Sequence, residues 1–348
     1  MNTIGVLEEN QVVFPKLGLD FEISDTAFTI AGLEIKWYGI FITIGLILAM
    51  VYAFKKMPSY GINPDKAIDV IIGGVLGGLV GARVYYVILN WEDYSSFWEM
   101  VNIRNGGLAV YGGLIGAVLV AAIIAKIKKV KLLPLLDIAG IGFLLGQGIG
   151  RWGNFTNQEA FGCNTDNIFG MSSGVIQDWI ARHGDTATVA AGEVMEVTKP
   201  VHPCFLYESV WCLLGFALLA IFAQKIRRFD GQIILMYAAW YGLGRFFIES
   251  LRVDSLMLGS LRVSQGVAAV CVVVSVILLI VIGLKVKRMG TDYQLYCETE
   301  ESINSLNEYY KKDDEQSEED EKEETQEISE TEEKTEQDIE NPEQEKDI

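Results

Sequence analysis

Histidine is almost absent from this 348-residue chain, and several other shortages limit what the protein can be. The two histidines, His183 and His202, are too few for a histidine-built metal centre, and the five cysteines follow no metal-ligand spacing. We therefore expect no metal and no other cofactor. No basic stripe exists to neutralise a polyphosphate backbone, so a nucleic-acid partner is not expected either. Charge of both signs is sparse before residue 291, which excludes an ordinary water-soluble globule.

Long apolar segments dominate the first 290 residues. A helix needs about 20 apolar residues to cross about 30 Å of hydrocarbon, and seven segments approach that length. These segments are 37–54, 68–89, 107–125, 132–150, 205–223, 232–248 and 265–284. The fold class that we predict is an all-α integral membrane protein with seven transmembrane helices.

Basic residues predict the orientation of these helices. Lysines and arginines cluster after the first, third, fifth and seventh segments, and therefore on one side of the membrane. Because short basic loops favour the cytoplasm, the N-terminus is predicted outside and the C-terminus inside. The loop between the fourth and fifth segments is the only long outer one, and we expect residues 155–203 to form a small external head.

Acidic residues are concentrated at the end of the chain. Residues 291–348 carry 24 of the 46 acidic side chains and 5 of the 28 basic ones. Aromatic residues are absent beyond Tyr310, so this segment cannot bury enough apolar surface to fold alone. We interpret 1–290 as a membrane domain and 291–348 as an acidic, disordered cytoplasmic tail without a role in chemistry.

Glycines recur at four-residue intervals in three of the predicted helices. The series are Gly73, Gly77 and Gly81, then Gly112 and Gly116, then Gly142, Gly146 and Gly150. Small residues at this spacing let helix backbones approach closely in lipid, so we expect them at helix–helix interfaces rather than around a phosphate.

Charged side chains within the predicted helices need a reason, because each costs on the order of 3 kcal/mol deep in the bilayer. Arg83, Arg151 and Arg245 fall in the outer parts of three helices. Snorkelling to the interface is the alternative for any one of the arginines, including Arg83 and Arg252. One helix face also collects polar residues at positions i, i+4, i+8 and i+11, namely Tyr241, Arg245, Glu249 and Arg252. These positions predict a cationic, tyrosine-lined recess that suits a phospholipid phosphate.

Residues 150–162 read GRWGNFTNQEAFG and closely resemble the G-R-x-G-N-F-x-N-x-E-x-x-G signature of the bacterial prolipoprotein diacylglyceryl transferases. Supporting matches extend the resemblance over about residues 38–265. It implies a multi-pass enzyme of the bacterial cell membrane with two partners, phosphatidylglycerol and prolipoprotein signal peptides that carry a lipobox cysteine. Such an enzyme moves the diacylglyceryl group onto the cysteine thiol, forming a thioether and releasing glycerol phosphate, in the first step of lipoprotein maturation.

The resemblance and the charge pattern together predict the site residues. The candidate catalytic residues are Arg151, Arg245, Tyr111 and Glu159. The candidate phosphatidylglycerol-binding residues are Arg151, Arg245, Tyr38, Asn154, Asn157, Tyr241 and Glu249. The arginines would hold the lipid phosphate and depress the pKa of the incoming thiol, which is normally about 8.5.

Several roles stay open at this point. Tyr111 stands where many family members have histidine, and we predict that it hydrogen-bonds or orients rather than acting as a base. Glu159 and Glu249 could orient an arginine or accept the thiol proton. Asn154 and Asn157 could bind the lipid glycerol or cap a helix.

Two other classes of protein fit some of these residues. A phospholipid transporter or flippase would use the same arginines, but it needs a polar path to the inner side that the apolar segments do not offer. An intramembrane hydrolase would need a nucleophile such as Ser172, for which no paired histidine is visible.

Overall fold

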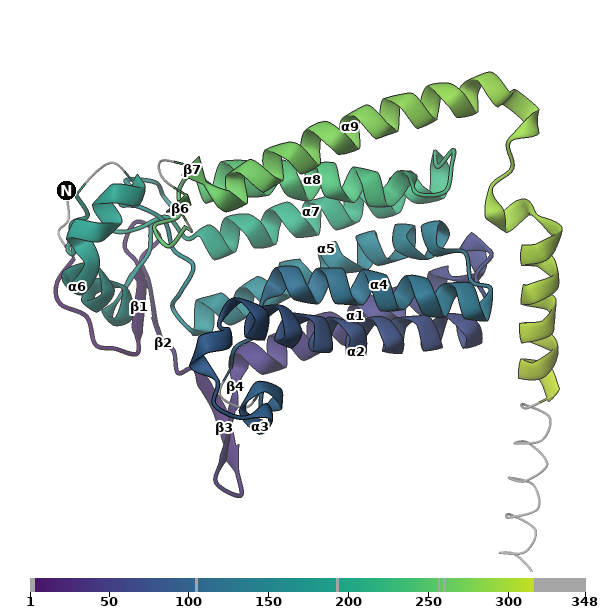
Figure 1. The fold of residues 1–348 in the computed structure, drawn as a ribbon. Coiled ribbons are helices and arrows are strands. Elements are labelled where there is room, and N and C mark those ends of the chain that lie inside the picture. The colour runs from purple at the N-terminus through teal and green to yellow at the C-terminus, as the bar shows by residue number, and fades with distance from the viewer. Residues whose placement is uncertain (1–3, 104–105, 192–193, 256, 259–260, 316–348) are drawn as a thin grey trace, which may run out of the picture. The chain divides into compact units, whose positions relative to one another are not determined.

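The computed structural model describes residues 4–103, 106–191, 194–255, 257–258 and 261–315 (Figure 1). The chain divides into two units by its internal contacts. Unit 1 comprises Met1–Tyr60 and Lys131–Tyr296, and unit 2 comprises Gly61–Val130 and Cys297–Ile348.

Long helices make up most of unit 1. In its described residues they are α1 (Trp37–Lys56), α5 (Leu132–Thr156), α7 (Cys204–Lys225), α8 (Gln232–Glu249) and α9 (Val263–Met289). Helix α5 is central, because α1, α7 and α8 all pack against it, and α9 packs on α8 (Figure 1). Buried apolar residues of α5, α7 and α8 form a common core that includes Ile141, Leu144, Cys212, Leu219 and Ile233.

Two indole rings join α7 to α8. Trp211 and Trp240 stack with their ring centroids 4.3 Å apart and their planes 14° apart. Trp211 Nε1 donates to the carbonyl of Trp240 at 2.9 Å, and Trp240 Nε1 donates to the carbonyl of Trp211 at 3.0 Å. Gly215 and Gly244 make room for the rings, since a Cβ at either position would lie 2.3 Å from the facing indole. The helices are thus bonded to each other at matching heights.

Unit 2 is built on one close helix pair. Helix α2 (Pro64–Leu89) packs on α4 (Val110–Lys128), and the short α3 (Phe97–Val101) lies between them in sequence. A Cβ at Gly81 would lie 2.4 Å from the carbonyl oxygen of Gly112, and one at Gly116 would lie 2.3 Å from that of Gly77. The predicted glycine interface is therefore confirmed for this pair.

The described part of the chain is mostly helical, as predicted, but short strands add to the helices. Strand β1 (Gln11–Phe14) pairs antiparallel with β2 (Leu19–Glu22) and with β5 (Ser172–Ser173). Two short hairpins also form, one from β3 (Thr26–Ile30) and β4 (Leu33–Lys36), the other from β6 (Met257–Leu258) and β7 (Leu261–Arg262). These strands are too short for their periodicity to be visible beside the long apolar runs.

The small head is built from more than residues 155–203. Helix α6 (Gly174–Ala191) and the loops around it pack against β1, whose Val12 and Phe14 are buried. Val12 and Phe14 share this core with Ile176 of α6 and with residues before and after that helix, including Phe161, Met171 and Val201. The N-terminal segment therefore completes the core of the head, which residues 155–203 do not form alone.

Six helices in the described part of the chain are long and apolar enough to cross a membrane: α1, α2, α4, α5, α7 and α9. Each of the seven predicted segments coincides with a helix. Helix α8 is not among the six, because Gln232, Arg245 and Glu249 lower its mean hydropathy. A seventh span and the direction in which the chain crosses the membrane stay predictions.

Part of the acidic tail is ordered, so the prediction of disorder is wrong for that part. Residues 300–315 form a helix that contacts the start of α2 within unit 2. Ser302 Oγ donates to the carbonyl of Gly61 at 3.0 Å, and Asn63 Nδ2 donates to that of Ser305 at 2.9 Å. The segment folds against α2 rather than alone, which composition could not reveal. Residues 316–348 lie outside the described residues.

Candidate active site

One buried carboxylate in unit 1 gathers three arginines. Glu208 lies near the start of α7, and its side chain is 4 % exposed. Its Oε1 is 3.0 Å from Nη1 of Arg245 and 3.5 Å from Nη1 of Arg252, while its Oε2 forms an ion pair with Arg151. We call these three arginines with Glu208 and Glu249 the arginine cluster. Such charges are stable at low exposure only because they pair with one another.

Helix α8 supplies two members of the cluster at i, i+4 spacing. Arg245 Nη2 lies 2.5 Å from Glu249 Oε2, and the Glu249 side chain is 1 % exposed. Arg262 Nη1 donates to the backbone carbonyl of Glu249 at 2.7 Å, at the end of the helix. The predicted polar face of this helix therefore does come together, and Glu249 forms a direct ion pair with Arg245.

Backbone contacts hold the start of α7 in place. The amide of Gly162 donates to the carbonyl of His202 at 2.8 Å, and the amide of His202 donates to that of Cys163 at 3.0 Å. Inside the helix pair, Ser209 Oγ donates to the carbonyl of Gly148 in α5 at 2.7 Å. Since Gly148 is one turn before Arg151, this bond sets Arg151 beside Glu208.

A chain of hydrogen bonds leads from the cluster to the loop after α5. Asn154 Oδ1 accepts from Arg151 Nη1 at 3.2 Å, and Asn154 Nδ2 donates to Glu159 Oε1 at 2.8 Å. Asn157 Nδ2 reaches the same Glu159 oxygen at 3.3 Å. Glu159 thus meets Arg151 through Asn154 rather than by a direct ion pair.

The loop that carries Glu159 has an unusual backbone. Gln158 and Ala160, on either side of Glu159, both have positive φ, 54° and 57°. This conformation costs energy for residues other than glycine and persists only where surrounding contacts enforce it. Gln158 is 6 % exposed, and its Nε2 donates to the carbonyl of Glu9 in the N-terminal segment at 2.9 Å. The head therefore holds the Glu159 loop in a defined position.

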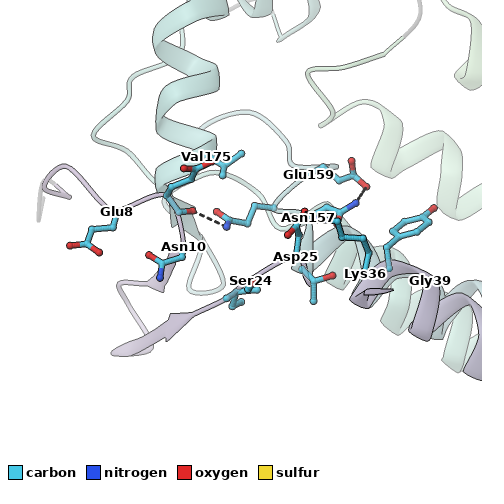
Figure 2. Close-up of a pocket in the computed structure, with 14 residues that line it drawn as sticks. Glu8, Asn10, Ser24, Asp25, Lys36, Gly39, Asn157, Glu159 and Val175 are labelled. Carbon is cyan, nitrogen blue, oxygen red and sulfur yellow. Dashed lines mark hydrogen bonds and ion pairs between the residues drawn. The ribbon is translucent and has the colours of Figure 1, made fainter. Parts of the chain in front are cut away.

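A cavity of about 1070 Å³ opens beside this loop (Figure 2). Figure 2 shows Asn157 bonded to Glu159 on one side, with Asp25 and Lys36 close by. Its lining also includes Tyr38, whose ring packs on Gly153, where a Cβ would lie 2.7 Å from the tyrosine Cδ2.

Charge in the cavity is mixed, with carboxylates in excess. Lys36 Nζ donates to Asp25 Oδ2 at 2.9 Å and lies 2.8 Å from Glu34 Oε2. Hydrogen bonds from Lys36 and Thr26 hold the pKa of Asp25 below its usual value. Glu8, Glu9 and Glu159 line the same space. The cavity thus places polar groups of both signs next to the hydrogen-bond chain from Arg151.

The remaining predicted residues lie in different places. Tyr241 is one helical turn before Arg245 on α8, and its ring stacks on Tyr237 with centroids 5.9 Å apart. Tyr111 lies in the first turn of α4, in unit 2, with 44 % of its surface exposed, and its role stays a prediction.

Arg83 has a structural role in unit 2. Its guanidinium donates to the backbone carbonyls of Glu99, Met100, Gly106 and Gly107 at 2.7–3.0 Å. These bonds hold α3 and the segment that follows it in place. The sequence-based suggestion that Arg83 snorkels to the interface is wrong, because its polar atoms are satisfied inside the protein.

Two residues of the cluster were missing from the predicted site. Arg252 shares the face of Arg245 but follows the end of α8, which made it resemble an interfacial arginine. Glu208 is a lone carboxylate near the start of an apolar helix. A carboxylate in an apolar helix without a basic residue nearby in sequence is the signal that could have identified Glu208, since such a charge needs cations from other helices.

Apolar helices that carry a buried arginine–carboxylate cluster define a class of multi-pass membrane protein with a polar site inside its helical unit. Comparison with known proteins specifies the family. The family model described as prolipoprotein diacylglyceryl transferase matches residues 25–281, and the chain belongs to this family. Membership and the apolar helices make it a multi-pass protein of the bacterial cell membrane.

Individual relatives agree over most of their length. A phosphatidylglycerol–prolipoprotein diacylglyceryl transferase of Clostridium perfringens is 39 % identical over 268 residues, which is 76 % of this chain and 97 % of the relative. The enzyme of Finegoldia magna is 42 % identical over 253 residues, 72 % of this chain and 93 % of the relative. That of Listeria monocytogenes is 38 % identical over 266 residues, 76 % and 91 % respectively.

Proposed function

We propose that this protein transfers the diacylglyceryl group of phosphatidylglycerol to the thiol of the lipobox cysteine of a prolipoprotein. Family membership and the names of the relatives support the reaction and its two substrates. The observation that carries the proposal for the site is the convergence of Arg151, Arg245 and Arg252 on Glu208.

The arginine cluster has the chemistry of a phosphate clamp. Each guanidinium carries five N–H donors in a planar fork, so the three groups have about 15, whereas Glu208 and Glu249 together offer about eight acceptor sites. Arg151 and Arg245 are each 20 % exposed, so part of both groups can reach a ligand. The two carboxylates hold the forks apart and in place before the lipid arrives. The arginine donors that the carboxylates do not occupy are suited to the two non-bridging oxygens of a phosphodiester.

The transfer forms one bond and breaks another. The cysteine sulfur attacks the glycerol carbon that carries the phosphate, and the carbon–oxygen bond to that phosphate breaks. Glycerol phosphate leaves with the bonding electron pair, and the thiol proton passes to a base. The arginines stabilise the negative charge that grows on the phosphate, and their positive potential favours the thiolate.

Glu159 is the candidate for contact with the second substrate. It borders the cavity of about 1070 Å³ and connects through Asn154 to Arg151. A carboxylate there could accept the thiol proton close to the clamp. We therefore assign Asn154 and Asn157 to the positioning of Glu159, and Tyr38 and Tyr241 to the lipid.

We further propose that α8 is a seventh span and that the arginine cluster faces the outer leaflet. Helix α8 has 18 residues, about 27 Å at 1.5 Å per residue, and packs between spanning helices. Lysines or arginines occupy the last turns of α1, α4, α7 and α9. Because basic helix ends favour the cytoplasm, the N-terminal ends of α1 and α7, near the cluster, would lie outside.

Pure enzyme, labelled phosphatidylglycerol and a lipobox peptide test this function. We expect a thioether product and release of glycerol phosphate. Arg151→Ala or Arg245→Ala, at an unchanged protein level, should reduce transfer by at least about 10³-fold, since each removes charge stabilisation from the transition state. Normal turnover by either variant would refute the assignment. Movement of intact lipid between leaflets without product would favour a flippase instead.

A further inference from the structure

A second group of cations lies in unit 1, at the ends of α1 and α7 that are farthest from the arginine cluster. Lys56 is the last residue of α1, Lys225 is the last residue of α7, and Arg227 follows two residues later. They line a cavity of about 410 Å³ together with Tyr52, Ser59 and Tyr60. This volume falls in the range of pockets that hold small molecules.

Tyr60 lines this cavity and carries an unused donor. The residue is 5 % exposed, and its hydroxyl is buried without a hydrogen-bond partner among the described residues. Burial raises the pKa of Tyr60, so the hydroxyl remains a neutral donor at physiological pH. A buried hydroxyl without an acceptor is destabilising, and a bound acceptor would remove that penalty.

The cations are only partly neutralised by the protein. Arg227 stacks its guanidinium 3.8 Å from the Tyr60 ring centroid and lies 3.7 Å from Asp230 Oδ1. Asp230 is shared, since its Oδ2 accepts from the amide of Tyr296 at 2.9 Å. Within the described part of the chain, Lys56 and Lys225 have no ion pair with a carboxylate. The cavity therefore carries net positive charge.

Helix dipoles explain only part of this arrangement. Lysines at the C-terminal ends of α1 and α7 would be favourable there without any ligand. The helix dipoles explain neither the cavity nor the unpartnered Tyr60 hydroxyl. An occupant with acceptor oxygens would account for both.

We propose that this cavity is a second phosphate-binding site, separate from the arginine cluster. A phosphate group would accept from Tyr60 and from the ammonium groups of Lys56 and Lys225. Its source is either the headgroup of an anionic phospholipid or a free phosphate in solution. The lipid source fits the proposed orientation, in which the cavity lies at the headgroup level of the inner leaflet.

The test uses the full chain in detergent and three variants. A cavity variant combines Lys56→Gln, Lys225→Gln and Tyr60→Phe. The control variant, Lys285→Gln with Lys287→Gln, removes two exposed lysines from the last turns of α9 and leaves the cavity intact. Tyr60→Phe alone removes only the unpartnered hydroxyl, and it carries the test if the combined variant does not fold.

Two probes distinguish the sources of phosphate. Native mass spectrometry counts bound phosphatidylglycerol, with phosphatidylcholine, whose zwitterionic headgroup has no net charge, as the comparison. We expect the cavity variant to retain one phosphatidylglycerol fewer than wild type, or to bind it about tenfold more weakly, while the control variant matches wild type. Thermal unfolding with inorganic phosphate, against chloride at equal ionic strength, tests the soluble source.

The outcomes separate cleanly. Loss of phosphatidylglycerol only in the cavity variant supports a lipid site. Stabilisation by inorganic phosphate that the cavity variant lacks supports a phosphate site filled from solution. If the cavity and control variants respond alike to both probes, the proposal is overturned. Because the arginine cluster is intact in every variant, these results do not depend on the transfer reaction.

Discussion

At the residue scale, Glu208 determines how the arginines are arranged. It is nearly inaccessible and contacts all three guanidinium groups. Removing one partner of a buried ion pair leaves the others uncompensated, which costs about 3–5 kcal/mol. Movement of the arginines toward solvent would lower that free-energy cost, but the arginine cluster would then lose its geometry.

We expect Glu208→Gln to lower kcat/KM by about 10²-fold, because three arginines lose their common anion. Asp254→Asn is the matched control, since Asp254 also pairs with Arg252 but is 44 % exposed, and its loss should change kcat/KM by less than about threefold. Steady-state transfer assays measure both. Equal effects of the two variants would mean that Glu208 does not organise the site.

Tyr111 allows a second test at this scale. Tyr111→Phe keeps the ring and removes the hydroxyl, and we expect transfer to fall by more than about threefold because a hydrogen bond to substrate is lost. Tyr85→Phe changes another partly exposed hydroxyl of unit 2, and it should be silent. An unchanged rate for Tyr111→Phe would show that only the ring matters.

At the element scale, the α2–α4 interface depends on the absence of side chains. A Cβ at Gly116 would lie 2.3 Å from the backbone oxygen of Gly77, so one of the helices must move. We expect Gly116→Ala to destabilise unit 2 by about 1–3 kcal/mol. Gly283→Ala in α9 meets nothing within 4 Å and should be neutral or stabilising by up to about 1 kcal/mol. Thermal unfolding in detergent compares the two, and similar melting curves would contradict this explanation.

The sequence predicted the elements better than their contacts. Apolar length identified the helices, and glycine spacing identified the α2–α4 interface, because both signals are local. The short strands could not be predicted, because they have only two to five residues each, and β1 also pairs with β5, about 160 residues away in the chain. The partners of Glu208 were equally hidden, because they depend on the rotation of α5, α7 and α8 about their axes. Arg245 and Glu249 share one helix, and their contact followed from spacing alone.

At the scale of the whole molecule, the end of the chain divides into parts with different roles. Residues 291–296 contact unit 1, where Tyr293 Oη accepts from the amide of Asp230 at 3.1 Å. Residues 300–315 contact α2 in unit 2. The acidic composition alone suggested a tail without structural contacts.

We expect a chain that ends at Glu315 to keep the stability and transfer rate of the full chain. A chain that ends at Arg288 loses four hydrogen bonds that join the tail to Gly61, Asn63 and Asp230, besides the polar contacts that Lys66 and Asp65 make with it. At about 1 kcal/mol each, they correspond to a fall in Tm of about 5–10 °C. Differential scanning measurements would show this difference, and an equal Tm for both truncations would mean that the helix at 300–315 does not stabilise the protein.

The reciprocal tryptophan pair fixes the position of α7 relative to α8. Trp211 lies one turn after Glu208 on α7, and Trp240 lies just over one turn before Arg245 on α8. Sliding one helix past the other would break both indole hydrogen bonds and separate the stacked rings. The gap between the central carboxylate and its arginine is thus preset, so in the proposed reaction the lipid would find the site already assembled.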